Sequence, residues 1–266
     1  MPDTPRLYAD LARLWPVLSP PEDYADEVAT LGELIDDTLG EPPADQRWSV
    51  LELGAGGGHS ITHLKDKYDC TAADLSKQML EQCRALNPDV PTVVGDMRSM
   101  RLDQQFDVVL ICDAIDYMLT EDDALAALKT AAAHLRPGGL VLMAPTYTRE
   151  TFVDGDVADD GTPPMDDAAQ SDEPQPGVTF FTFVYDPEPA DTTFEMILLY
   201  LIRDRETRRV KVIEDRHTCG LFSIARWQAM MTQAGLETEA LAEQPDPESD
   251  ADAAAWSVLF RGIRAV

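Results

Sequence analysis

The sequence predicts a three-layer α/β fold, in which a Rossmann-like sheet of seven mainly parallel strands lies between helices. Short apolar runs alternate with helical stretches between residues 48 and 144, which is typical of a parallel sheet with crossover helices. The run FDVVLIC at 106–112 is apolar at nearly every position, as expected of a strand buried on both faces. A glycine-rich turn at 54–58 follows the first apolar run and precedes a helical stretch.

Residues 1–45 are predicted to form a helical lid. Leucines recur at helical spacing in its first half. A second helix is expected over 22–39, where Gly40 ends it. Tyr8 and Trp15 are expected to be packing residues of this lid.

Residues 46–146 are predicted to form the core, in which parallel strands alternate with helices. Open α/β sheets bind ligands beyond the carboxyl ends of their strands, so the loops that follow these strands are candidate sites. The expected strands are 48–53, 71–74, 92–94, 106–112 and 140–144, and the expected helices are 59–67, 77–87 and 120–135.

The alternation of strands and helices stops near residue 147, and residues 147–222 are predicted to form a β-rich cap that shapes a substrate pocket. The segment 154–177 is rich in Asp, Gly and Pro, so it is expected to be a solvated acidic loop. Strand-like runs follow at 178–185, 192–203 and 208–219.

Residues 223–266 are predicted to complete the core sheet. Ser223 is a good N-cap for a helix that ends at Gly235. Runs at 236–241 and 256–263 are then expected to form an antiparallel hairpin, with an acidic loop between them.

The charge of the chain limits its partners. It carries 49 acidic and 21 basic residues, which gives a net charge of −28. Such a charge excludes general binding to nucleic-acid phosphates or to anionic membranes. The Asp-rich, Lys-poor composition indicates a halophilic protein, because concentrated salt screens self-repulsion. An ordinary acidic protein is the alternative interpretation.

The cysteines and histidines favour neither a metal site nor a disulfide framework. Four cysteines lie far apart without a C-x-x-C motif, as expected of reduced thiols in a cytoplasmic protein. No apolar run reaches membrane-spanning length, and the first residues lack the features of a signal peptide. His59 and His63 have the spacing of a metal pair, but no third ligand is evident, so they are expected on a surface face of their helix.

The glycine-rich turn and the strand ends that follow it predict a nucleoside-containing ligand. Glycine lets the backbone approach a ligand closely, and the free N–H groups favour polar or negative groups. Asp74 lies 20 residues after Gly54, where a carboxylate can accept both hydroxyls of an adenosine ribose. Asp96, after the third strand, can meet an adenine amino group. The dinucleotide fingerprint would require glycine at position 59, and His59 counts against NAD.

Together these motifs resemble those of the class I S-adenosylmethionine (SAM)-dependent methyltransferases. ELGAGGG at 52–58 is similar to that family's E/D-x-G-x-G-x-G motif, and AADLSKQML at 72–80 to its acidic second-strand motif. GDM, FDVVLI and LRPGG follow in the family's order and spacing, so the resemblance covers residues 46–145. It implies SAM as the cofactor and S-adenosylhomocysteine as the product. The cofactor-binding residues that it implies are Glu52, Gly54, Ala55 and Gly56 near the methionine part, Asp74 at the ribose, Leu75 and Met79 beside the adenine, Gly95, Asp96 and Met97 at its edge, and Cys112.

A narrower likeness extends beyond this region. EDYADEV, IDYM and RETFVDG are similar to segments of the amino-sugar N,N-dimethyltransferases. This likeness implies that Tyr24 helps to hold the SAM carboxylate, that Tyr117 lies at the reaction centre, and that the protein is a homodimer. The acidic insert 154–177 departs from that pattern, so the sugar acceptor is not carried over.

Methyl transfer to an amine requires an aligned nucleophile, exclusion of water and an unprotonated nitrogen. Tyr117 can orient an amine, and Asp113 or Asp116 can bind a substrate ammonium and pass its proton on. His217 is the candidate base, because imidazole changes charge near neutral pH. The sequence therefore predicts methylation of a small molecule, at nitrogen rather than oxygen.

Three other functions stay open at this point. The same fold can methylate a hydroxyl or carbon of a quinone-like or polyketide-like acceptor. It can also act as a non-catalytic module that binds SAM or a partner, and an NAD-dependent oxidoreductase is the third alternative. The candidate residues have structural alternatives as well: Asp113 and Asp116 as charges at a helix N-terminus, and His217 as a packed strand residue.

Overall fold

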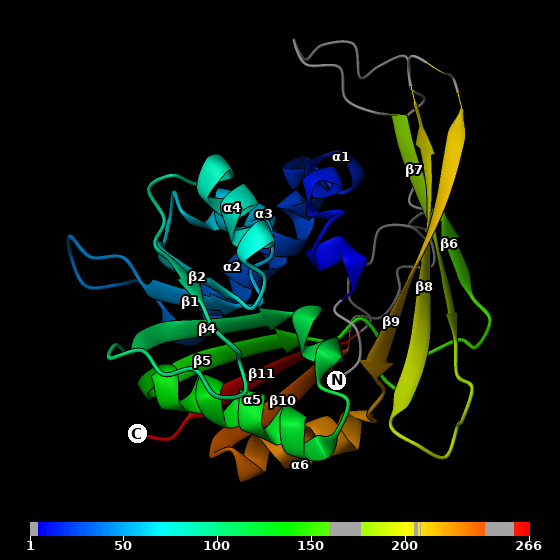
Figure 1. The fold of residues 1–266 in the computed structure, drawn as a ribbon. Coiled ribbons are helices and arrows are strands. Elements are labelled where there is room, and N and C mark those ends of the chain that lie inside the picture. The colour runs from blue at the N-terminus through cyan, green and yellow to red at the C-terminus, as the bar shows by residue number, and fades with distance from the viewer. Residues whose placement is uncertain (1–4, 160–176, 205–206, 208, 243–257) are drawn as a thin grey trace, which may run out of the picture.

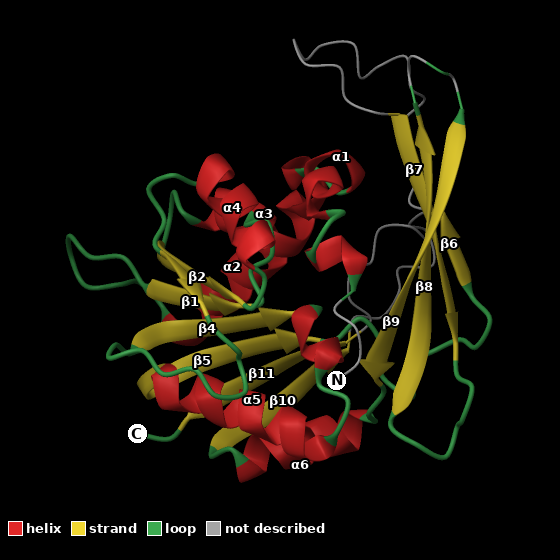
Figure 2. Cartoon of the chain, in the orientation of Figure 1, coloured by secondary structure: helices red, strands yellow, loops and turns green. Residues whose placement is uncertain are grey.

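The computed structural model describes residues 5–159, 177–204, 207, 209–242 and 258–266. In this part of the chain, a seven-stranded sheet is covered by helices, and a four-stranded sheet stands beside it (Figure 1). Figure 2 shows helices on both faces of the large sheet. The predicted three-layer α/β fold with a mainly parallel sheet is confirmed.

The large sheet consists of β1 (Ser49–Leu53), β2 (Asp69–Asp74), β3 (Thr92–Val94), β4 (Phe106–Cys112), β5 (Leu135–Ala144), β10 (Leu236–Ala242) and β11 (Val258–Arg264). Its strand order is β10-β11-β5-β4-β1-β2-β3. β11 is antiparallel to β5 and β10, and the other neighbours are parallel. The order reverses between β1 and β4, so the loops after these strands meet at a switch point, where such sheets bind ligands.

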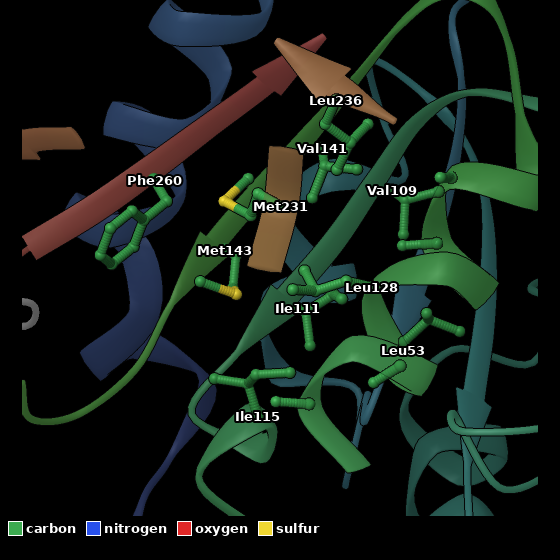
Figure 3. Packing of buried hydrophobic residues seen from close by; sticks show 14 of the residues in the cluster. Leu53, Val109, Ile111, Ile115, Leu128, Val141, Met143, Met231, Leu236 and Phe260 are labelled. Carbon is green, nitrogen blue, oxygen red and sulfur yellow. The ribbon is translucent and has the colours of Figure 1, made fainter. Parts of the chain in front are cut away.

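The two faces of the sheet bury different helices because successive strand residues point to opposite sides. The helices and 3-10 turns are η1 (Arg6–Tyr8), η2 (Ala12–Leu14), α1 (Trp15–Leu18), η3 (Pro21–Tyr24), α2 (Ala25–Leu39), α3 (His59–Leu64), α4 (Lys77–Leu86), η4 (Ala114–Tyr117), α5 (Glu121–His134) and α6 (Ile224–Gln233). In β4, Val109 and Ile111 pack with α5 and α6 (Figure 3), whereas Val108 and Leu110 pack with α2, α3 and α4.

The second sheet is antiparallel and has the order β6-β7-β8-β9, with β6 (Val157–Asp159), β7 (Gly177–Tyr185), β8 (Thr193–Arg203) and β9 (Val210–Gly220). Its inner face packs on the N-terminal segment: leucines 7, 11, 14 and 18 share one buried cluster with Leu198, Tyr200 and Ile213. The first turns of the chain therefore lie between the two sheets (Figure 1).

Several expected elements differ from the structure. The N-terminal leucines lie in and between two short 3-10 turns and the four-residue helix α1, rather than in one continuous helix, because packing on the second sheet determines their conformation. Residues 157–159 were expected in an acidic loop but form β6, whose backbone pairs with β7. Residues 160–176 of that segment, and the expected acidic loop near 243–255, lie outside the described residues. β5 begins at Leu135, where it pairs with Phe106 ahead of the glycines. The N-cap role of Ser223 is confirmed, because its side chain accepts from Arg226 N–H.

Replacing Leu128 with Ala tests the core beneath α5. Leu128 is fully buried between α5 and the sheet (Figure 3), so its truncation is expected to lower the free energy of unfolding by about 2–5 kcal/mol. Guanidinium titration measures the loss. Val153→Ala is the control, because Val153 is 60% exposed and its truncation is expected to change stability by less than about 0.5 kcal/mol. Equal losses in both variants would contradict the assigned core.

Candidate active site

The glycine turn after β1 holds two loops in close contact. Gly54 has a φ of 85°, and its N–H donates to Ala73 O at 2.7 Å. A Cβ at Gly54 would lie 2.1 Å from the Cβ of Ala114, the first residue of η4. It would also lie 3.3 Å from the end of Met97. Only glycine allows this approach, which brings together the loops after β1 and β4.

Asp74 holds the same turn from the end of β2. Its carboxylate accepts from Gly56 N–H at 2.9 Å and from Ser76 N–H at 2.7 Å. Burial raises the pKa of Asp74 above its ordinary value, although these hydrogen bonds oppose the shift. Met79 is buried, and its end lies 3.4 Å from a Cβ placed on Gly56. Leu75 is 67% exposed, so it offers an apolar surface beside Asp74.

Two further carboxyl groups lie at this end of the sheet, where burial and the negative charges around them oppose their ionisation. Glu52, in β1, is buried, and one of its oxygens has no hydrogen-bond partner. Burial raises the pKa of Glu52 to about 8, and the negative charges of Asp74 and Asp113 add to the shift. Burial and Asp113 also raise the pKa of Glu27, in α2, to about 7. Such a site favours a ligand that brings positive charge.

The lid covers the helix that follows the glycine turn. The His59 ring is buried and stacks on the Trp15 ring, with 6.1 Å between the ring centroids. It also makes an edge-on contact with the Tyr24 ring, with 5.4 Å between the centroids. Burial lowers the pKa of His59 to about 4. The expectation that His59 lies on a surface face is therefore wrong, because residues of the lid pack on it. His63 Nε2 lies 2.6 Å from Pro21 O, and the described residues contain no cluster of metal-ligand type.

The Tyr24 hydroxyl lies 2.9 Å from Ser19 Oγ. Tyr24 is also close enough to the acidic groups for their negative charge to raise its pKa. Burial raises the pKa of Tyr24, and the charges of Asp113, Glu27 and Glu52 contribute. The hydroxyl therefore stays protonated and can donate a hydrogen bond. Ala55 is buried beside the turn, where its N–H donates to Ala73 O at 3.0 Å.

The loop after β4 carries the predicted acidic pair. Asp113 has a φ of 53°, which is unusual for a residue with a side chain and typical of functional sites. Asp116 is buried: one oxygen accepts from Thr146 N–H at 3.1 Å and the other has no partner. Burial raises the pKa of Asp116 well above its ordinary value. Burial also raises the pKa of the Cys112 thiol, so it is no thiolate at neutral pH.

The same loop ends in a chain of hydrogen bonds that joins both sheets and the lid. The Tyr117 hydroxyl lies 2.6 Å from His217 Nδ1 and 2.9 Å from the Tyr8 hydroxyl. His217 Nε2 lies 3.1 Å from Asp215 Oδ2, and both of these β9 side chains are buried. Burial raises the pKa of Tyr117 well above its ordinary value, so its hydroxyl is neutral. Two of the predicted catalytic residues, Tyr117 and His217, are therefore in contact.

Asp96 lies apart from this group. Both of its carboxylate oxygens bind Arg98, and this pairing lowers the pKa of Asp96 below its ordinary value. Arg98 also pairs with Asp123. Gly95 N–H donates to Asp74 O at 3.0 Å, so the end of β3 still adjoins the end of β2.

Three residues of the site were not singled out by the sequence. Tyr8 was assigned to packing, and Glu27 and Asp215 were not considered. Asp215 and His217 are two residues apart on a strand, so they share a face; this alternation was the available signal. Nothing local indicates that Tyr8 reaches Tyr117, since 109 residues separate them.

Sequence comparisons identify related enzymes. The methyltransferase domain family profile matches residues 50–139. The chain is 30% identical over 226 residues to the dTDP-3-amino-3,4,6-trideoxy-alpha-D-glucopyranose N,N-dimethyltransferase of Streptomyces venezuelae. This alignment covers 84% of this chain and 88% of that protein. It is 27% identical over 236 residues to the dTDP-3-amino-3,6-dideoxy-alpha-D-glucopyranose N,N-dimethyltransferase of Streptomyces fradiae, with coverages of 83% and 88%.

Structural comparison agrees with these matches. The crystal structure of Streptomyces venezuelae DesVI superposes with a TM-score of 0.77 at 26% identity, covering 97% of this chain and 98% of that one. SAM-bound CalS10, an amino pentose methyltransferase from Micromonospora echinaspora, shares the fold with a TM-score of 0.71 at 21% identity, covering 91% and 92%. The chain belongs to the SAM-dependent methyltransferases, in the family that includes the sugar N,N-dimethyltransferases. It is an enzyme, and SAM is its cofactor.

Replacing Glu52 with Gln is expected to change how stability depends on pH. The folded-state pKa of Glu52, about 8, exceeds its ordinary value of 4.5, so its stabilising contribution is complete below about pH 4.5 and lost as pH rises through 8. The free energy of unfolding of the variant should therefore rise relative to that of the wild type by up to about 1.4 kcal/mol per pH unit within this window. Denaturant titrations of both free proteins at pH 5, 7 and 9 measure this difference. If the free energies of unfolding of the two proteins change in parallel with pH, the assigned burial of Glu52 is contradicted.

Proposed function

We propose that the protein transfers the methyl group of SAM to an amine nitrogen of a small molecule, with amino sugars as the acceptor class to test first. The observation that carries this proposal is the contact of Tyr117 with His217, beside the carboxylates at the switch point. The two relatives described above are named for N,N-dimethylation of amino sugars, which supports nitrogen as the acceptor atom.

The residues at the glycine turn fit the cofactor. SAM carries a sulfonium and an ammonium, and Glu52 offers a buried oxygen without a partner among acidic neighbours. We assign Glu52, Ala55 and the glycines at 54 and 56 to its methionine part. Tyr24 donates to its carboxylate, and Cys112 contributes to the same wall.

The adenosine is assigned to the ends of β2 and β3. Asp74 binds the ribose, since one carboxylate can serve the glycine turn and accept from hydroxyls. Leu75 and Met79 flank the adenine. The loop after β3, from Gly95 to Met97, borders it. The main chain of this loop is the better candidate for the contact, because Arg98 occupies the Asp96 carboxylate.

When bound, SAM would supply an electrophilic methyl group on its sulfonium, and the sulfur would keep the electron pair of the C–S bond that breaks. The chain's own residues must deliver a neutral amine. An acceptor ammonium donates its proton to the Tyr117 oxygen, and Tyr117 passes its own proton to His217 Nδ1, 2.6 Å away. Asp215 then faces the imidazolium and balances its charge. Asp113 attracts the ammonium to this place, and Asp116, whose protonated form is favoured by burial, offers an oxygen without a partner.

We assign residues 1–45 to a lid and residues 147–222 to a cap that selects the acceptor. The core, 46–146, and the closing segment, 223–266, would carry the cofactor between them. Among the described residues, every helix is too short or too polar to span a lipid bilayer. A homodimer, a cytoplasmic location and adaptation to salt stay predictions.

Replacing Asp74 with Ala is expected to weaken SAM binding at least tenfold, because the variant loses both the ribose acceptor and the hydrogen bond that holds Gly56. Isothermal titration calorimetry measures the affinity. Asp69→Ala is the matched control, since Asp69 is an exposed carboxylate at the start of the same strand. Unchanged affinity in Asp74→Ala would refute this cofactor site.

The acceptor class is tested by release of S-adenosylhomocysteine from SAM in molar KCl, across amino sugars, other small amines, polyamines and phenols. Turnover is expected with amines alone. Tyr117→Phe should lower kcat about 100-fold while leaving SAM affinity within threefold, because the proton path is lost.

Tyr185→Phe is the control for that variant, since Tyr185 is a cap tyrosine outside the proton path. Turnover of phenols that survives in Tyr117→Phe would replace the proposal by O-methylation. SAM binding without turnover of any acceptor would favour a module without catalysis.

A further inference from the structure

The buried carboxylate of Asp215 is held by three donors. His217 Nε2 and Leu7 N–H contact Oδ2, at 3.1 and 2.7 Å, and Arg6 N–H donates to Oδ1 at 2.9 Å. Asp215 is only 4% exposed, so it does not serve the solvated acidic surface that gives the chain its charge. Burying a carboxylate is costly unless hydrogen bonds compensate for it, and here each oxygen has at least one.

These donors keep Asp215 ionised. Burial alone would raise its pKa, but the hydrogen bonds from His217, Arg6 and Leu7, together with the positive charge of a protonated His217, outweigh burial, and the pKa lies below the ordinary value. An ionised carboxylate only accepts hydrogen bonds. His217 therefore donates from Nε2 to Asp215, and in the neutral ring Nδ1 is an acceptor 2.6 Å from the Tyr117 oxygen. The Tyr117 hydroxyl donates to Tyr8 at 2.9 Å, so its single proton must turn to Nδ1 for the transfer.

The other two donors belong to the lid. Arg6 and Leu7 begin η1, and the next residue, Tyr8, has its hydroxyl 2.9 Å from that of Tyr117. The Tyr8 carbonyl accepts from Ser76 Oγ at 2.7 Å, two residues beyond the proposed ribose ligand. One turn of the lid thus contacts Asp215, Tyr117 and the cofactor loop.

We propose that Asp215 is a positioning residue for methyl transfer: it sets the tautomer of His217 and its charge balances the imidazolium that forms, while the lid backbone holds Asp215 in place. This inference rests on the proposed function. It adds that the proton path from Tyr117 to His217 is complete only while residues 6–8 are docked. The path then forms together with the cover over the cofactor loop, so the base is ready when the site is closed.

The tautomer is measured first, on the free protein, by 15N NMR of the histidine side chains, with His217→Gln to assign the signal. We expect the proton on Nε2. A proton on Nδ1 would overturn the proposal. This readout needs no acceptor, so it stands even if every amine fails and the proposed function is wrong.

Asp215→Asn then removes the charge while keeping the shape. It is expected to lower kcat about 100-fold, with the KM for SAM within threefold of the wild type. The amide must also place its NH2 group against a lid N–H, which loosens the lid. Arg6→Pro removes that N–H at the first position of η1, where proline is tolerated.

The double variant of Asp215→Asn with Arg6→Pro separates the two effects. It should regain part of the stability lost in Asp215→Asn, whereas kcat should stay low because the charge is still absent. Recovery of kcat in the double variant would make Asp215 a structural clamp and overturn its positioning role, as would a kcat within threefold in Asp215→Asn.

Arg6→Ala and Arg6→Pro form a matched pair for the lid. Both lose the ion pair with Asp10, but only proline loses the N–H that binds Asp215. We expect a kcat at least threefold lower in Arg6→Pro than in Arg6→Ala. Equal values would show that the lid does not support Asp215 and overturn that part of the proposal.

Discussion

The contact between the turn after β1 and the turn after β4 is the constraint on which the site depends. Without a side chain on Gly54, η4 can lie directly on the glycine turn. This contact places Asp113, Asp116 and Tyr117 next to the residues that we propose bind the cofactor. The second sheet and the lid then meet η4 from the other side, through His217 and Tyr8.

Buried charge and surface charge have separate roles in this protein. Most of its 49 acidic residues give the molecule its net charge, and they indicate little about chemistry. A few, such as Glu52, Asp116 and Asp215, are withdrawn from water, where an ionised carboxylate is costly without a partner. Their environments differ: donors keep Asp215 ionised, whereas burial favours the protonated forms of Glu52 and Asp116.

The core could be predicted from the sequence because its signals are local. Apolar runs, N-caps and glycine turns set the strands and helices of residues 46–146 almost as the structure has them. The conformation of the lid and of β6 could not be predicted from the sequence, because packing and pairing with the second sheet determine it. Tyr117 could be predicted because its motif is local. Its contacts with Tyr8 and His217 could not, because they join distant segments of the chain. Asp215 adjoined a predicted residue but lacked a motif of its own.

The lid reaches Asp215 through main-chain N–H groups, which every residue except proline possesses. The side chain at position 6 can therefore change in evolution without loss of this hydrogen bond, whereas Leu7 is also constrained by the buried cluster that it joins. Related chains with a different residue at position 6 could keep the same connection, and a comparison of sequences would rank that position as unconstrained. What selection would preserve is the length of chain between these N–H groups and the Tyr8 side chain, together with the exclusion of proline.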